Sequence, residues 1–138
     1  MIIRHYDLEV ALPDSWWIEA EMVGFVPKSR AFRPNLRAAQ GLAVFEAKID
    51  AVAPLKRAPG VGVFNDNEEA TAKERVVRIL RGFREEAELP PIHLVKLGHE
   101  TKFRYKIGNG SHRFYCSLAV GFTHVPAFEG FDFDADYI

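Results

Sequence analysis

The sequence predicts a mixed α/β domain of the α+β type, with helices packed on a small mixed sheet. Between residues 44 and 128 the predicted elements follow the order strand, helix, hairpin, helix, strand. This alternation of strand and helix patterns is typical of a sheet covered by helices. At 138 residues, the chain is long enough to bury one core without disulfides or metals.

The chain is predicted to contain one folded domain with an extension at each end. We assign residues 1–43 to an N-terminal extension, residues 44–128 to the main domain and residues 129–138 to an acidic tail. Within the first extension, residues 16–25 fit either a strand or a short helix. Burial of at least one of the two tryptophans at its start is the expected role of that pair.

The first half of the main domain predicts a strand, a loop and a helix. Residues 44–52 are rich in β-formers and form a strand, and residues 55–62 form a loop with glycine and proline. Thr71 and Glu74 have the spacing of a capping box and mark the start of a helix. That helix has one apolar face and a stripe of arginines at i+3 steps, which is usually a solvated surface: Arg75, Arg78, Arg81 and Arg84.

The second half predicts a hairpin, a helix and a last strand. Residues 92–97 form a buried strand, and residues 102–107 alternate between apolar and basic side chains as a second strand. A helix over residues 112–120 ends at Gly121, and the chain returns to the sheet near Val125.

Composition restricts the classes of function. The formal net charge is −1, so no global attraction to nucleic acid or membranes is expected. Cys116 is the single cysteine, and the five histidines lack metal-ligand spacing, so we expect neither a disulfide nor a metal site. No run reaches the about 18 apolar residues of a membrane span, and residues 1–10 do not resemble a signal peptide. We therefore expect a cytoplasmic protein without membrane contact.

The turn formed by Gly110, Ser111, His112 and Arg113 is the strongest candidate site. We predict Ser111 as the N-cap of the last helix. His112 and Arg113 then lie in the first turn, where the helix dipole disfavours cations. A strand, a glycine turn and a helix start with free N–H groups make an anion site. An anion bound there would make Arg113 a clamp, and Gly110 would allow close approach of the backbone.

A second interpretation of this turn needs no ligand. Arg113 could fold over to pair with a carboxylate of its own chain, while Ser111 only caps the helix. Asp132 or Asp134 of the tail could supply that carboxylate and close the site. Local chemistry alone leaves both interpretations open, because short glycine motifs occur often by chance.

A longer segment, PPIHLVKLGHETKFRYKIGNGSHRFYCSLAVGFTHVP over residues 90–126, resembles the ParB/sulfiredoxin superfamily. The shared pattern is a Pro-Pro-Ile strand, a second strand, a Gly-x-His-Arg turn, a small-residue helix and a Val-Pro strand. The resemblance extends over residues 44–128 and does not include residues 1–43. It implies a ParB/sulfiredoxin-like fold for this protein, as a stand-alone domain.

The resemblance also implies a ligand. In that superfamily the turn holds nucleotide phosphates, ATP in sulfiredoxins and CTP in chromosome-partition proteins. Carried over to this sequence, the phosphate ligands are Gly110, Ser111, His112 and Arg113, with Lys56 and Arg57 as supporting cations.

Two departures from the family narrow this expectation. Ser111 stands where sulfiredoxin has its catalytic cysteine, so sulfiredoxin activity is not expected. Only ten residues follow Phe128, so we do not expect the helix-turn-helix domain of the partition proteins.

The leading hypothesis is a protein that binds a nucleotide or another phosphate-bearing ligand, with Mg²⁺ as a candidate cofactor. Phosphoryl hydrolysis or transfer would need a nearby carboxylate, for which Asp50, Asp66 and Glu68 are candidates. One alternative is a ParB-like nuclease or other nucleic-acid-acting protein, which a continuous basic surface from the arginine-rich helix to the glycine turn would favour. The other is a non-catalytic interaction module.

Overall fold

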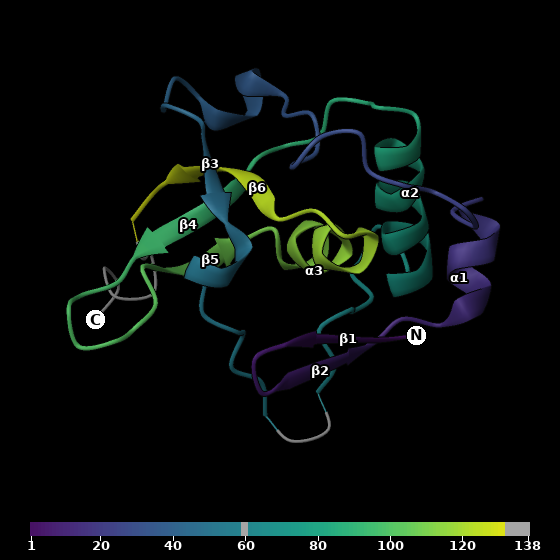
Figure 1. The fold of residues 1–138 in the computed structure, drawn as a ribbon, viewed down its shortest axis with the longest axis horizontal. Helices are drawn as coiled ribbons and strands as arrows, with labels where there is room; N and C mark the ends of the chain where they lie inside the picture. Colours follow the sequence, from purple (N-terminus) through teal and green to yellow (C-terminus); the bar gives the residue numbers. More distant parts are fainter. Residues whose placement is uncertain (59–60, 132–138) are drawn as a thin grey trace.

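A four-stranded mixed sheet forms the centre of the fold, which is of the predicted α+β class. The structure is a computed structural model that describes residues 1–58 and 61–131 (Figure 1). The sheet has the order β3-β6-β4-β5, with β4 and β6 parallel and the other neighbours antiparallel. Its strands are β3 (Phe45–Lys48), β4 (Ile92–Lys96), β5 (Tyr105–Asn109) and β6 (His124–Glu129).

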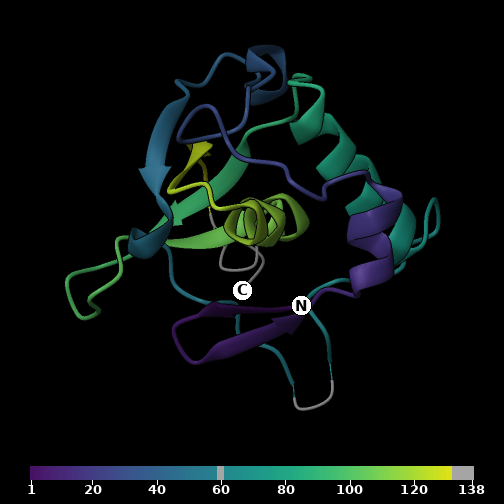
Figure 2. The same ribbon diagram turned by 45° about the vertical axis from the view of Figure 1, so that its right-hand side comes forward.

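Two helices pack beside this sheet, α2 (Ala72–Arg84) and α3 (Ser111–Val120). Figure 2 shows α3 between the sheet and α2. It contacts α2, β1, β4 and β6, and it is the most buried helix among the described residues. Its buried side chains are His112, Phe114, Tyr115, Cys116, Ser117 and Val120.

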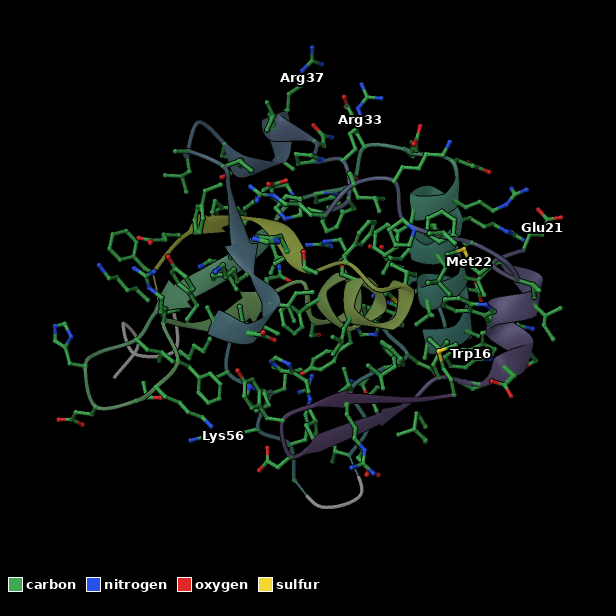
Figure 3. The ribbon with its side chains drawn as sticks, in the orientation of Figure 1. Trp16, Glu21, Met22, Arg33, Arg37 and Lys56 are labelled. Carbon is green, nitrogen blue, oxygen red and sulfur yellow. The ribbon has the colours of Figure 1, made fainter. Side chains whose placement is uncertain are left out.

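The first 43 residues pack into the same core. They form the hairpin of β1 (Ile2–His5) and β2 (Leu8–Ala11), the short helix α1 (Asp14–Glu19) and the single turn η1 (Leu36–Ala39). Six of their buried apolar side chains join the main hydrophobic cluster, namely Ile3, Val10, Leu12, Ala20, Met22 and Phe32. Figure 3 shows Met22 next to α2. The ambiguous segment thus contains a helix, whose two tryptophans are half-buried against this core.

Two predicted strands have different limits in the structure. β3 ends at Lys48 because the 3-10 turn η2 (Ile49–Ala51) redirects the chain. The N–H of Ala53 then donates to the Tyr105 carbonyl at 2.8 Å, so this segment lies along β5 and curls the sheet. β5 begins at Tyr105 and not at residue 102, because residues 98–104 form the turn of the hairpin. An irregularity in β4 then brings Asn109 opposite His93.

The predicted N-terminus of α2 is confirmed. The Thr71 hydroxyl accepts the N–H of Glu74 at 3.1 Å and lies 3.1 Å from the Glu74 carboxylate. Asp66 accepts the N–H of Ala72 at 2.6 Å, which satisfies a further donor of the first turn.

Both long helices end in the same hydrogen-bonded turn. In α2 the N–H of Ala87 donates to Gly82 at 2.9 Å, and in α3 the N–H of Phe122 donates to Ser117 at 3.1 Å. The left-handed residue of this turn is Gly121 in α3, with φ of 96°, but Glu86 in α2, with φ of 55°. Only glycine adopts that conformation without a steric cost.

This difference gives a prediction on stability. We expect Glu86→Gly to raise the free energy of unfolding by about 0.5–1 kcal/mol, because it removes left-handed strain from an exposed position. Gly121→Ala should lower it by about 1 kcal/mol, since the nearest atom to the added Cβ is 3.9 Å away and the cost is conformational. Urea unfolding measures both. If both substitutions changed the free energy of unfolding in the same direction and by the same amount, the assignment of left-handed strain to Glu86 would be contradicted.

Candidate anion-binding site

Gly110 determines how α3 begins. It has φ of 103° and is itself the N-cap, so Ser111 is the first helical residue and the prediction that Ser111 caps the helix is wrong. Because glycine reaches the left-handed region freely, the helix starts one residue earlier than a serine cap would allow. Among the described residues no side chain caps this helix start, so its first N–H groups have no side-chain acceptor there.

Gly110 also makes room for Arg113. A Cβ at position 110 would lie 2.9 Å from Nη2 of Arg113 and 3.2 Å from Ile92. The guanidinium therefore packs directly over the glycine backbone. Its Nη2 donates to the Pro91 carbonyl at a long 3.4 Å. Its buried Nε has no hydrogen-bond partner among the residues that the structure describes. Within residues 1–58 and 61–131, Arg113 forms no ion pair.

Burial lowers the pKa of Arg113, and the nearby charge of Arg75 lowers it further. Two cations thus share this site, and an anion would relieve their repulsion. The alternative carboxylate partners for Arg113, Asp132 and Asp134, lie outside the described residues.

A pocket of about 290 Å³ lies between α2 and the start of α3. Its lining combines three arginines, an apolar wall and the glycine turn: Arg75, Arg78, Arg113, Ile79, Leu89, Pro90, Asn109, Gly110, Ser111 and His112. These ten residues include no carboxylate. The pocket is therefore positively charged and suited to an oxyanion.

The arginine stripe of α2 divides between two environments. Arg81 donates to the Glu19 carbonyl at 3.0 Å, and Arg84 pairs with Glu21 at 3.4 Å, so both face the end of α1 and the residues that follow it. Arg75 and Arg78 instead line the pocket. The i+3 stripe predicted solvated surface for all four arginines, so the place of Arg75 and Arg78 in the pocket lining was not predicted. The i+3 spacing was the available signal, but it does not show which neighbours the stripe meets.

His112 is held as a neutral hydrogen-bond acceptor. Its ring is buried, and Nε2 accepts the N–H of Asn65 at 3.1 Å, so a neutral ring carries its proton on Nδ1. Burial and then the charge of Arg75 lower the pKa of His112 to about 4. Its imidazole is thus uncharged at neutral pH and does not act as a cation in the pocket.

The predicted supporting cations are not part of the pocket lining. Lys56 and Arg57 are exposed in the loop after η2, and Figure 3 shows Lys56 at the lower left, away from α2. The Tyr115 hydroxyl anchors this loop by accepting the N–H of Leu55 at 3.1 Å. Burial raises the pKa of Tyr115, and the charge of Arg57 opposes that rise. The same charge helps to lower the pKa of His112, which places Arg57 near the start of α3.

The carboxylates considered for catalysis do not line the pocket. Asp66 caps α2, and the main-chain carbonyl of Asp50 accepts the Tyr6 hydroxyl at 2.6 Å. Glu68 is exposed in the turn before α2. In the part of the chain that the structure describes, no group of three or more His, Cys, Asp or Glu side chains is placed to hold a metal ion. The arrangement therefore supports binding of an anion more directly than its hydrolysis.

Comparison with known proteins leaves the family open. The chain matches no model of a protein family, and a search of curated proteins finds no match either. Membership of the ParB/sulfiredoxin superfamily therefore stays a prediction from the sequence pattern of residues 44–128, chiefly 90–126. No helix in the described residues is long and apolar enough to cross a membrane.

The lowered pKa of His112 predicts a pH dependence of stability. The unfolded chain binds a proton below about pH 6.5, whereas the folded protein binds it only near pH 4. The free energy of unfolding should therefore fall between pH 6.5 and 4, by an amount on the order of 2–3 kcal/mol. Burial lowers the pKa of His5 as well, and this histidine contributes in the same direction.

Unfolding curves at several pH values test this prediction. His112→Gln should reduce the slope between pH 4 and 6.5, because the amide does not titrate there. His99→Gln, at an exposed position, is the control for loss of an imidazole. An unchanged slope in His112→Gln would contradict the assignment of the buried neutral ring.

Proposed function

We propose that this protein binds a phosphate-bearing small molecule, a nucleotide being the leading candidate, in the pocket between α2 and the start of α3. The observation that carries this proposal is the convergence of Arg75, Arg78 and Arg113 on the first turn of α3. In the described part of the chain, none of the three forms an ion pair. A bound phosphate would supply a negatively charged partner for these three arginines.

The helix start and the arginines suit the same ligand. The first N–H groups of α3 and the positive end of its dipole favour an anion at Ser111. The guanidiniums add charge-assisted hydrogen bonds with a planar geometry that matches phosphate oxygens. A tetrahedral oxyanion thus satisfies donors from both helices at once.

The apolar wall of the pocket supports an organic phosphate over a bare ion. Ile79, Leu89 and Pro90 line the pocket beside the three arginines. Such a surface can cover the apolar face of a ribose or base while the phosphate contacts the charged side. The resemblance of residues 90–126 to a superfamily that binds ATP or CTP agrees with this choice. Mg²⁺ would enter with the nucleotide, on its phosphate oxygens.

A nucleic acid is the second candidate, because one observation favours it. Arg75 and Arg78 extend the positive surface from the glycine turn onto α2. This surface stops after Arg78, since Arg81 and Arg84 contact α1. A track for a phosphate backbone needs a longer series of cations, so the short cluster fits a small ligand better.

Calorimetry with inorganic pyrophosphate, ATP and CTP, each with and without Mg²⁺, tests the proposal. We expect Arg113→Ala to weaken binding by about tenfold to a hundredfold, as loss of a charged hydrogen bond does. Arg78→Ala should weaken it less, because this side chain is more exposed. Absence of binding by the wild type to all three probes would overturn the proposal.

Arg37→Ala is the matched control. It removes the same charge from an exposed position in η1, which Figure 3 shows at the far edge of the molecule, and should leave affinity unchanged. A gel-shift titration with single-stranded and duplex oligonucleotides separates the second candidate. Strong, salt-dependent binding of oligonucleotides without binding of free nucleotides would favour nucleic acid.

A further inference from the structure

We propose that His112 is a positioning residue, which holds Arg75 in the anion pocket through the peptide backbone of Asn65. This inference rests on the proposed function, because it assigns a role to one side chain of that same pocket. Two hydrogen bonds carry it. The N–H of Asn65 donates to Nε2 of His112 at 3.1 Å, and Nη1 of Arg75 donates to the Asn65 carbonyl at 3.0 Å.

We call these two hydrogen bonds, from Arg75 to Asn65 and from Asn65 to His112, the relay. The relay connects the two helices that form the pocket. His112 lies in the first turn of α3, and Arg75 lies in the first turns of α2. Asn65 belongs to the loop that precedes α2 and is half-buried. Because one residue receives a bond from Arg75 and gives one to His112, movement of the Asn65 backbone would displace the guanidinium.

The segment around Asn65 is held on both sides, and the hydrogen bond that its N–H donates to His112 lies between these two contacts. The Phe64 ring packs on the His112 ring with centroids 5.5 Å apart, and Trp16 packs on Phe64 at 6.5 Å. On the other side, Asp66 caps α2. The backbone of Asn65 thus stands between an aromatic contact and a helix cap.

The role requires a neutral imidazole, and its surroundings keep it neutral. The charged groups that face His112 are Arg75 from α2, Arg57 from the preceding loop and Arg113 from α3. All three are cations and oppose protonation of the ring. A protonated ring would have no free acceptor for the Asn65 N–H, so the relay would break in acid.

Binding of inorganic pyrophosphate at pH 7.5 tests the relay. We expect His112→Phe to weaken binding about as much as Arg75→Ala, on the order of tenfold. The first variant displaces the guanidinium of Arg75 from the pocket, and the second deletes it. His112→Gln keeps an acceptor at a similar reach and should restore most of the affinity. The double variant His112→Phe with Arg75→Ala should bind no more weakly than Arg75→Ala alone.

Two results would overturn the inference while leaving the proposed function intact. One is wild-type affinity in His112→Phe, and the other is fully additive losses in the double variant. Failure of the wild type to bind pyrophosphate would count against the proposed function itself. The relay is then decided by amide hydrogen exchange, which needs no ligand.

For that measurement, the Asn65 amide should exchange slowly in wild type and in His112→Gln, and fast in His112→Phe. In wild type its protection should also be lost as the pH falls toward about 4. Equal protection in wild type and His112→Phe would show that the amide does not depend on this ring, and the inference would fail.

Discussion

The concentration of positive charge at the start of α3 is the constraint on which the site depends. Arg75, Arg78 and Arg113 meet at a helix end that is itself electropositive, and the ten residues lining that pocket include no carboxylate. Such an arrangement is unfavourable in an isolated protein, and burial of Arg113 adds to its cost. It becomes favourable when an anion occupies the pocket. Gly110 makes it sterically possible, because a Cβ at this position would lie only 2.9 Å from Nη2 of Arg113.

The rest of the fold supports this cluster from several directions. The sheet and the β1–β2 hairpin bury α3, so its first turn has a fixed position. The end of α1 and the residues after it bind Arg81 and Arg84, and the other two arginines of α2 remain at the pocket. Residues 1–43 therefore contribute to the site indirectly, by dividing the arginine stripe of α2.

Local signals in the sequence were sufficient for much of the fold. The hydroxyl of Thr71, the alternation in the hairpin and Gly121 predicted α2, the β4–β5 pair and the end of α3. The N-cap of α3 was beyond reach, because Gly110 and Ser111 both suit a helix start and only the backbone angle distinguishes them. The end of β3 depends on pairing with Tyr105, more than 50 residues away in sequence.

Only part of the candidate site could be predicted, because here too local signals are visible in the sequence and long-range contacts are not. Its α3 half is a contiguous motif, whereas Arg75, Arg78 and the backbone of Asn65 reach the pocket only through packing of distant elements. A crystal structure determined with inorganic pyrophosphate, from sulfate-free solution, tests the central claim most directly. The account predicts a phosphate group against the N–H groups of Ser111 and His112, within hydrogen-bond distance of Arg113. A carboxylate of the chain occupying that position, with pyrophosphate absent, would contradict it.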